Sequence, residues 1–243
     1  MKTRITELFG IEHPILCGGM HRLCVPKLCA AVSNAGGLGS LTASTYPEKK
    51  DFVKAIREVR KLTDKPFWCN VTMLPAVHLG EENYKNYFDA IIEENVPAVE
   101  ISGMPVDRLA NGEYLDRLLE AGVKLVHKVG SVRHAKHAEK VGYSAVIAAG
   151  VEEGGHPLNE NVATTVLTPR IAESVKIPVI ATGGMADGRG LAIDSQNFWA
   201  TFFWGLLYLG DFRGEWGFSL GFFLFLPSFS LFFFEVKAFF PLT

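Results

Sequence analysis

The sequence predicts an α/β fold, a (β/α)8 barrel (TIM barrel) that is incomplete, with about seven strand–helix units. Three observations predict it. Short apolar runs alternate with helical patterns up to Leu191, with a repeat of roughly 25 to 35 residues, which implies right-handed βαβ units and a parallel sheet. Glycine or polar residues follow many of these runs, whereas a doubly wound open sheet, the rival fold, concentrates its glycine fingerprint after the first strand. No eighth unit follows the seventh run.

Seven short apolar runs are the predicted strands, because runs of this kind, bounded by glycine, proline or polar residues, are typical of buried strands. They occupy residues 14–20, 38–41, 66–73, 98–102, 123–129, 144–149 and 178–181. The first run contains Gly18 and Gly19, which indicates a turn where the backbone approaches another group closely. The third run is unusual, since Asn70 and Thr72 lie near its C-terminal end.

Six segments with apolar residues at helical spacing connect these strands. They occupy residues 25–34, 47–62, 83–94, 114–121, 132–141 and 169–175. Glycines indicate where several of these helices end: Gly36 follows the first, Gly122 the fourth and Gly142 the fifth. The second segment is clearly amphipathic, and Phe52 and Ile56 belong to its apolar face.

The composition of the chain changes after Asp194. Most of the phenylalanines lie beyond this point, and residues 217–234 carry no charge. The tail contains no apolar run that is followed by a glycine turn and an amphipathic helix. We therefore predict a barrel domain at residues 1–192 and a separate hydrophobic tail at residues 193–243, with no eighth strand.

Charge and cysteine content exclude several classes of function. The formal net charge of −2 gives no basic field that would attract nucleic acid. The four cysteines have no metal-ligand spacing and are interpreted as small buried residues in a reducing compartment: Cys17, Cys24, Cys29 and Cys69. The N-terminus has no apolar signal-peptide core, so we expect a cytoplasmic protein.

Residues 178–190 predict an anion site. An apolar strand is followed by Gly183 and Gly184, and Asp187 to Arg189 would open a helix. Backbone N–H groups and the positive end of the helix dipole would then point at one place, which suits a phosphate. The alternative is an ordinary turn between a strand and a helix, where glycine pairs are common.

Two residues could carry chemistry near the predicted strand ends. His156 lies in a glycine-rich loop after residues 144–149, where it would act as a base or substrate contact, or only cap a turn. Lys128 is the last charged residue of the strand predicted at residues 123–129. Its ammonium group would reach a phosphate or an electron-rich ring, or else extend to solvent at the edge of the sheet. Glu152 and Glu153 are interpreted as solvated loop charges.

Other polar residues also allow both a functional and a structural interpretation. Asn70 and Thr72 alternate onto one strand face and would hydrogen-bond a flat ligand or neighbouring loops. His134 and His137 have a spacing that suits two metal ligands on a helix, but no third ligand is near and the helix is rich in lysine. A solvated helix face is favoured, and no metal site is predicted. His21 could reach a pocket beside the first strand.

Six motifs in order resemble the nitronate monooxygenase (2-nitropropane dioxygenase) family of FMN-dependent TIM barrels, over about residues 3–192. They are HPILCGGM at 13–20, NAGGL at 34–38, PFWCNVTMLP at 66–75, HK at 127–128 with VRHA at 132–135, GGHP at 154–157 and TGGMADGRG at 182–190. The motifs at 66–75 and 127–135 look most like the branch described as NAD(P)H:quinone reductases. Enoyl-acyl-carrier-protein reductases of the second type share the barrel and the FMN.

The resemblance implies a role for particular residues. His156 would be the catalytic base or substrate contact. The flavin would be held by Gly19, Met20, His21, Asn70, Thr72, Lys128 and Gly150, and its phosphate by Gly183, Gly184 and Met185. The implied activity is oxidation of alkyl nitronates with O2. The alternative is quinone reduction with NAD(P)H as electron donor, and the substrate is a small molecule in either case.

The sequence departs from the family at two places. Pro157 and Leu158 follow His156 where the family often has a glycine. After Leu191 the family's alanine-rich helix, eighth strand and second half of the phosphate site have no counterpart, so we expect weak FMN binding or none. A frameshift or intron read-through would explain the tail and leave an inactive truncated barrel. The alternative is a membrane attachment through residues 217–234.

Overall fold

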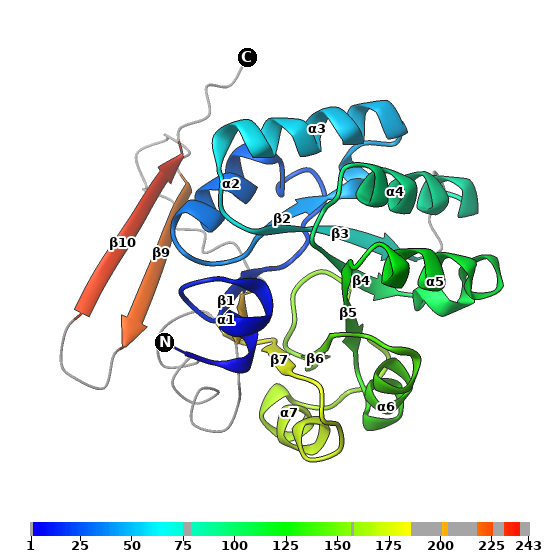
Figure 1. The fold of residues 1–243 in the computed structure, drawn as a ribbon. Helices are drawn as coiled ribbons and strands as arrows, with labels where there is room; N and C mark the ends of the chain where they lie inside the picture. Colours follow the sequence, from blue (N-terminus) through cyan, green and yellow to red (C-terminus); the bar gives the residue numbers. More distant parts are fainter. Residues whose placement is uncertain are drawn as a thin grey trace.

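The computed structural model of the chain describes residues 2–74, 79–156, 158–185, 201–203, 218–225 and 231–238. Strands and helices alternate as predicted, and Figure 1 shows α2 to α7 on the outside of a curled sheet. The strands are β1 (Ile15–Cys17), β2 (Gly39–Thr42), β3 (Phe67–Met73), β4 (Ala98–Gly103), β5 (Lys124–Val129), β6 (Ala145–Ala149), β7 (Val179–Thr182), β8 (Thr201–Phe203), β9 (Phe218–Phe225) and β10 (Leu231–Ala238). The helices are α1 (Arg4–Phe9), α2 (Pro26–Asn34), α3 (Lys49–Leu62), α4 (Glu81–Glu93), α5 (Glu113–Glu120), α6 (Val132–Val141) and α7 (Thr164–Ala172), with 3-10 helices η1 (Ala43–Thr45) and η2 (Val106–Gly112).

One sheet contains β1 to β8, in the order β1-β8-β7-β6-β5-β4-β3-β2, and its pairings are parallel. The strands at the two ends of this order, β1 and β2, are joined by a parallel bridge between Leu16 and Leu38, so the sheet curls back on itself. The fold is therefore TIM-barrel-like. The C-terminal ends of the strands open on one face, where the active sites of such barrels lie.

The eighth strand differs from the prediction. The sequence predicts no strand after Leu191, yet β8 lies between β1 and β7, with Thr201 opposite both Ile15 and Ala181. The edges of β1 and β7 carry backbone groups that need partners, and a threonine–phenylalanine segment has high β propensity whatever its family pattern. The barrel is still incomplete, because β8 has only three residues and no helix follows β7 or β8 in the described part of the chain.

Alternate residues of the strands pack on opposite faces of the sheet. One cluster of buried residues fills the inside of the barrel: Ile5, Phe9, Ile11, Leu16, Leu38, Trp68, Ala98, Val126, Ala145, Ile147 and Ile180. A larger cluster lies between the sheet and the outer helices and includes Cys69, Val71, Val99, Ile101 and Leu125. Because side chains alternate with a period of two, the inner face of β3 continues from Trp68 to Asn70 and Thr72.

Helix α1 covers the N-terminal end of the barrel, and the sequence analysis did not predict it. Thr3 caps its first turn, Gly10 ends it with a φ of 70°, and Ile5 and Phe9 point into the inner cluster. Phe9 packs edge-on against Trp68 with ring centroids 5.8 Å apart, and the Trp68 indole N–H donates to the carbonyl of Cys17 at 3.1 Å. This end of the barrel is therefore closed by apolar packing, which leaves the opposite end for a site.

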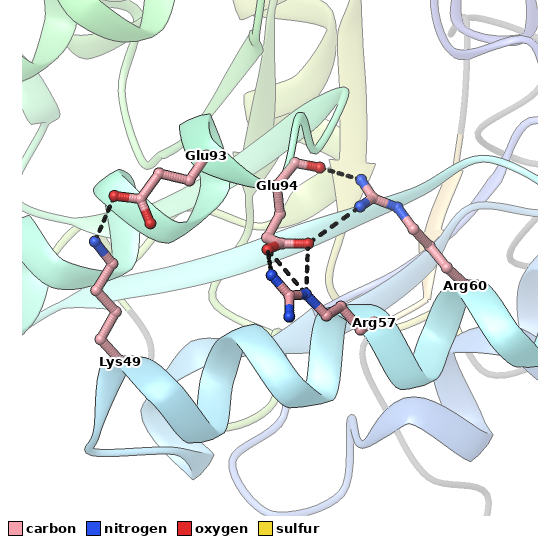
Figure 2. A network of polar contacts seen from close by, with 5 residues as sticks. All are labelled: Lys49, Arg57, Arg60, Glu93 and Glu94. Carbon is pink, nitrogen blue, oxygen red and sulfur yellow. Dashed lines mark hydrogen bonds and ion pairs between the residues drawn. The ribbon is translucent and has the colours of Figure 1, made fainter.

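Helices α3 and α4 are joined by the network of ion pairs in Figure 2. Glu94, just after α4, accepts from Arg57 at 2.7 and 3.1 Å and also contacts Arg60, while Lys49 pairs with Glu93 at 2.6 Å. The hydrogen bond from Arg57 lowers the pKa of Glu94, against a smaller effect of burial. The arginines are largely exposed, so the network positions two neighbouring helices and adds little stability.

The boundaries of α7 are the clearest error in the predicted helices. The sequence places this helix at residues 169–175, starting at Pro169, whereas α7 begins at Thr164 and contains Pro169 in its interior. The start is set by a distant group, because the carboxylate of Glu152 accepts from the backbone N–H of Thr164 at 2.9 Å. A cap supplied from another loop leaves no local signal in the sequence.

The tail forms an antiparallel hairpin in the structure, with Phe218 opposite Ala238 and Phe225 opposite Leu231. Figure 1 draws β9 and β10 outside the curled sheet. Within the described ranges, none of the helices has both the length and the apolar character needed to cross a bilayer. The uncharged stretch at residues 217–234 is thus described as strand rather than helix where the structure describes it.

The stability of the fold is expected to fall with acidity because of His127. This imidazole is buried on the outer face of β5, donates from Nδ1 to the carbonyl of Ile101 at 3.0 Å and lies against the ring of Tyr143. Burial lowers the pKa of His127 to about 4, against the hydrogen bond to Ile101. An unfolded histidine has a pKa near ~6.5, so the unfolded chain binds the proton first as the pH falls.

We expect His127 to remove about 3 kcal/mol from the free energy of unfolding between pH 7 and pH 4, in order of magnitude. Urea unfolding at pH 7, 6, 5 and 4 measures the slope. Glu100 and Glu153, whose pKa values are raised by burial, act in the opposite direction. The comparison with His127→Gln isolates the histidine, because that variant keeps both carboxyl groups. Equal slopes for the two proteins would contradict the prediction.

Candidate active site at the C-terminal end of the barrel

The upper half of the barrel interior is polar. On the inner face, two residues beyond the apolar layer, lie Ser40 of β2, Asn70 of β3, Glu100 of β4, Lys128 of β5 and Thr182 of β7, all buried. Figure 1 shows β3, β4 and β5 as neighbours, and their register places Asn70 opposite Glu100. Polar groups in such a place cost stability unless they are paired. Their presence at the C-terminal ends of the strands therefore indicates a site.

Glu100 is the centre of one hydrogen-bond network. It is fully buried, accepts from the Asn70 amide, and accepts from the Ser102 hydroxyl at 2.5 Å. The Thr72 hydroxyl lies 3.4 Å from Oδ1 of Asn70. Burial raises the pKa of Glu100, opposed by these hydrogen bonds and by the charge of Lys128. Asn70 and Thr72 share a face as predicted, but Asn70 donates to Glu100 on the neighbouring strand β4 and Thr72 contacts Asn70 itself, so neither of these contacts is to a loop.

Lys128 is paired, which neither of its two sequence interpretations anticipated. It is 4% exposed, so it does not snorkel at an edge, and its Nζ lies 3.2 Å from Oε1 of Glu153 and 3.4 Å from the carbonyl oxygen of His156. The interpretation of Glu153 as a solvated loop charge is wrong, because Glu153 is 6% exposed. Gly155, with a φ of 85°, lies in the turn between Glu153 and His156, the two residues of this loop that contact Lys128.

His156 lies in the same loop, held by its backbone. Its side chain is exposed, while its carbonyl accepts from Lys128, whose pairing with Glu153 anchors the loop at the barrel mouth. An imidazole that is exposed at this end of the barrel is accessible to a substrate. Of the two residues that follow the histidine, Leu158 is half-buried and Pro157 lies outside the described residues.

The glycine turn after β7 packs against the start of α7. Gly183 has a φ of 117° and Gly184 a φ of 73°, a region that L side chains rarely adopt. The Thr164 hydroxyl lies 3.1 Å from the carbonyl oxygen of Gly183, and Met185 is buried. The predicted strand and glycine turn are therefore present. The predicted helix start at Asp187 to Arg189 lies outside the described residues.

The turn after β1 lies close to the polar interior. A Cβ atom on Gly19 would come within 2.2 Å of Oδ1 of Asn70. The close backbone approach that the glycines indicated is therefore present, and the group approached is the Asn70 side chain of β3. Met20 packs beside Cys17 and Cys24, and His21 is exposed with its Nδ1 3.1 Å from the Ser44 hydroxyl. The structure thus brings Gly19 to Asn70, while His21 is held by the loop after β2.

The described residues fit a flavin in two respects. Three buried hydroxyl groups on the inner face lack a protein partner among the described residues: Ser40, Thr42 and Thr182, together with Oε2 of Glu153. The second is the glycine turn at 183 and 184, which ends β7 where the phosphate is expected, although the Thr164 hydroxyl lies 2.5 Å from the place of a Cβ atom on Gly183. The remaining half of a phosphate site would come from residues that the structure does not describe.

Metal and disulfide chemistry gain no support from the described residues. Within these ranges no group of three His, Cys, Asp or Glu residues is placed to hold a metal ion. The four cysteines are buried, as predicted, and none forms a disulfide in the described structure. The sulfur atoms of Cys17 and Cys24 lie 3.8 Å apart. His137 contacts Asp107 at 2.9 Å, so this helix face is not simply solvated.

A cavity of about 480 Å³ opens beside the polar interior, and the sequence analysis did not find it. It is lined by Gly103, Met104, Pro105, Arg108, His127, Lys128, Arg133, His134, His137, Leu158, Asn159 and Glu160. Its size is typical of small-molecule sites. No local pattern predicts such a cavity, because three separate connections, those after β4, β5 and β6, form its walls.

Gly150, at the start of the loop after β6, packs closely against Thr164 at the start of α7. A Cβ atom at this position would lie 2.1 Å from the Thr164 hydroxyl and 2.4 Å from its backbone nitrogen. We expect Gly150→Ala to lower the free energy of unfolding by about 3 kcal/mol, since the start of α7 must move. Gly80→Ala is the matched control, because no atom of the described residues lies within 4 Å of its Cβ position. Urea unfolding measures both; equal losses would contradict the contact.

The family model and a curated relative that match this chain share one family name. The family model described as nitronate monooxygenase matches residues 2–193. A Rhodococcus jostii protein named (3aS,4S,5R,7aS)-5-hydroxy-7a-methyl-1-oxo-octahydro-1H-indene-4-carboxyl-CoA dehydrogenase is 38% identical over 194 residues, covering 79% of this chain and 50% of that protein. A probable nitronate monooxygenase of Staphylococcus aureus is 36% identical over 228 residues, covering 78% of this chain and 62% of that protein. The chain thus spans about half to two thirds of these relatives.

Solved structures agree with the fold. FabK from Thermotoga maritima superposes with a TM-score of 0.72 at 40% sequence identity, covering 83% of this chain and 61% of that one. A nitroalkane oxidase from Streptomyces ansochromogenes gives a TM-score of 0.71 at 28% identity, covering 83% of this chain and 67% of the other.

Proposed function

Because this chain belongs to the nitronate monooxygenase family, whose members are flavin-dependent oxidoreductases, we propose that it oxidises alkyl nitronates with O2 and uses FMN. The observation that carries this proposal is the position of His156. Lys128 holds the backbone of this residue at the mouth of the barrel, beside a polar interior, while the imidazole stays exposed. A base that faces a substrate needs this combination of a fixed backbone and an accessible ring.

The proposed flavin site uses the residues that line the upper barrel. They are Gly19, Met20, His21, Asn70, Thr72, Lys128 and Gly150 for the ring and ribityl chain, and Gly183, Gly184 and Met185 for the phosphate. Residues 1–192 would form this flavin domain, and residues 193–243 would be a tail outside it. Lys128 suits a place near the ring because a cation favours the negative charge that a flavin gains on reduction.

The protein groups would act on the substrate in a simple way. When bound, FMN supplies the acceptor for the electrons that leave the substrate. The imidazole of His156 would donate a hydrogen bond to an oxygen of the nitronate anion, or take the proton from the carbon beside the nitro group when the neutral nitroalkane binds. Lys128 and Glu153 would keep this loop in place, and the apolar lower barrel would keep water out of the site.

A second candidate is an NAD(P)H-dependent reductase on the same flavin barrel, with a quinone as electron acceptor. One observation favours it. The cavity beside the barrel mouth has two arginines in its wall, Arg108 and Arg133, and at about 480 Å³ it is larger than a small nitronate requires. A pyridine nucleotide carries phosphates that would suit such a wall.

The two candidates are separated by one pair of assays on the full chain supplied with FMN. The proposed function predicts O2 consumption with propane-2-nitronate in the absence of any pyridine nucleotide. It also predicts that NADH or NADPH will not bleach the flavin under anaerobic conditions. Rapid bleaching by either nucleotide, with quinone turnover and without nitronate oxidation, would favour the second candidate. FMN affinity, measured by fluorescence quenching, tests the expectation of weak binding.

A further inference from the structure

The cavity beside the barrel mouth has a wall rich in positive charge. Arg108 comes from η2 and Arg133 from the first turn of α6, so two elements bring guanidinium groups to one place, beside the buried Lys128 of β5 that is paired with Glu153. Glu160 is the carboxylate in this lining, and it lies 3.7 Å from the ring of His134. The cavity therefore has more cationic than anionic groups.

Within the part of the chain that the structure describes, neither arginine has a carboxylate as an ion-pair partner. Over the described ranges, no carboxylate oxygen lies within 4.0 Å of the guanidinium group of Arg108 or Arg133, although Nη2 of Arg133 lies 3.3 Å from the ring of His134. The nearby carboxylate of Asp107 is bound to His137 at 2.9 Å. The guanidinium groups are exposed and remain available to a ligand.

The charge pattern of α6 points the same way. Its first turn contains no acidic residue, although Asp or Glu is favoured there, and it carries Arg133 and His134 instead. Positive side chains at this end of a helix oppose the helix dipole and cost stability. An anion bound in the cavity would be attracted by both the side chains and the helix end, which would remove this cost.

The walls of the cavity are fixed by close packing. A Cβ atom on Gly130, the residue after β5, would lie 2.7 Å from Oε2 of Glu160 and 3.0 Å from Leu158. The segment after His156 therefore lies directly on the end of β5. Lys128 reaches both the cavity and the carbonyl of His156, which connects the cavity to the proposed reaction site.

We infer that Arg108 and Arg133 form a binding site for the phosphate groups of a nucleotide-containing ligand, whose reactive end extends to the barrel mouth. Paired arginines suit phosphate because each guanidinium offers two parallel N–H donors. Two ligands share this chemistry, a pyridine nucleotide that donates electrons and a coenzyme A thioester that is the substrate. The inference rests on the proposed function in taking the barrel mouth as the place of reaction.

The test measures binding of inorganic pyrophosphate to the full chain by isothermal titration calorimetry. The variant Arg108→Gln with Arg133→Gln is expected to weaken binding by at least about tenfold, as expected when a charge-assisted hydrogen bond is lost. Arg108→Lys with Arg133→Lys keeps the charge but not the fork and should recover part of the affinity. Lys136→Gln is the control, because Lys136 is exposed on the same helix and does not line the cavity.

Competition then identifies the ligand. Displacement of pyrophosphate by NADH or NADPH assigns the site to an electron donor, and displacement by a coenzyme A thioester assigns it to a substrate. Displacement by neither would overturn the nucleotide assignment. Equal affinities of the glutamine variant and the Lys136→Gln control, with unchanged circular dichroism, would overturn the whole inference.

The result is separable from the proposed function, because pyrophosphate binding requires neither flavin nor turnover. A chain that binds pyrophosphate through the arginines but fails to oxidise propane-2-nitronate would contradict the proposed function and support this site. A chain that oxidises nitronate normally and shows no arginine effect would overturn this site alone.

Discussion

Replacing His156 with alanine is expected to lower the rate of nitronate oxidation by about 10²- to 10⁴-fold, the usual contribution of a positioned acid or base. The fold should survive, because the side chain is exposed and its role in the structure is carried by the backbone carbonyl that accepts from Lys128. The measurement is the initial rate of O2 consumption with propane-2-nitronate at saturating FMN, together with the thermal melting temperature.

The control for this substitution is His13→Ala. His13 is half-buried at the opposite, N-terminal end of β1 and belongs to no part of the proposed site. We expect its rate to stay within about twofold of the parent, because surface substitutions away from a site have small effects. His156→Gln should lose activity like alanine, since an amide cannot exchange a proton near neutral pH. A His156→Ala chain that keeps full activity would remove this residue from the mechanism.

Replacing Lys128 with methionine is expected to lower the free energy of unfolding by about 3–5 kcal/mol, the usual cost of breaking a buried ion pair. The reason is the burial of both neighbouring carboxyl groups. Glu153 would lose its cationic partner and already has no partner for Oε2 within the described residues, and Glu100 would lose a nearby positive charge.

The loss should depend on pH. Burial already raises the pKa of Glu100 and of Glu153, and Lys128 opposes both shifts. Without the lysine the folded-state pKa values rise further above their unfolded values, so protonation favours the folded state. The variant should therefore lose least stability in acid and progressively more as the pH rises through the raised pKa values. Urea unfolding between pH 5 and pH 8 measures this trend.

Two further variants make the Lys128 prediction specific. Lys124→Met changes the same residue type at the start of the same strand, where the side chain is half-buried, and should cost less than about 1 kcal/mol. Glu153→Gln added to Lys128→Met should restore part of the lost stability, because a neutral amide tolerates burial better than an unpaired carboxylate. A Lys128→Met protein as stable as Lys124→Met would show that the buried pair is not a source of stability.

Much of the barrel could be predicted because its signals are local. Short apolar runs bounded by glycine and proline gave the first seven strands to within a few residues, and Gly122 and Gly142 marked true helix ends. The period of two along β3 correctly placed Asn70 and Thr72 on one face. The start of α7 and the strand β8 were wrong, since the first depends on a cap from Glu152 and the second on the open edges of β1 and β7.

In the candidate site, too, local sequence signals identified some residues, while long-range contacts decided how they are paired. The sequence alone located Asn70, Thr72 and Lys128 at the ends of their strands, because residue type and strand periodicity can be read along the chain. It did not single out Ser40, Glu100, Ser102 or Thr182, which the structure buries beside them. Only the tertiary structure decided that Lys128 pairs with Glu153, that Glu100 accepts from Asn70 and Ser102, and that Arg108 and Arg133 line one cavity. These partners are set by strand register and by loops that fold back between units, and such long-range contacts leave no periodic trace in the sequence.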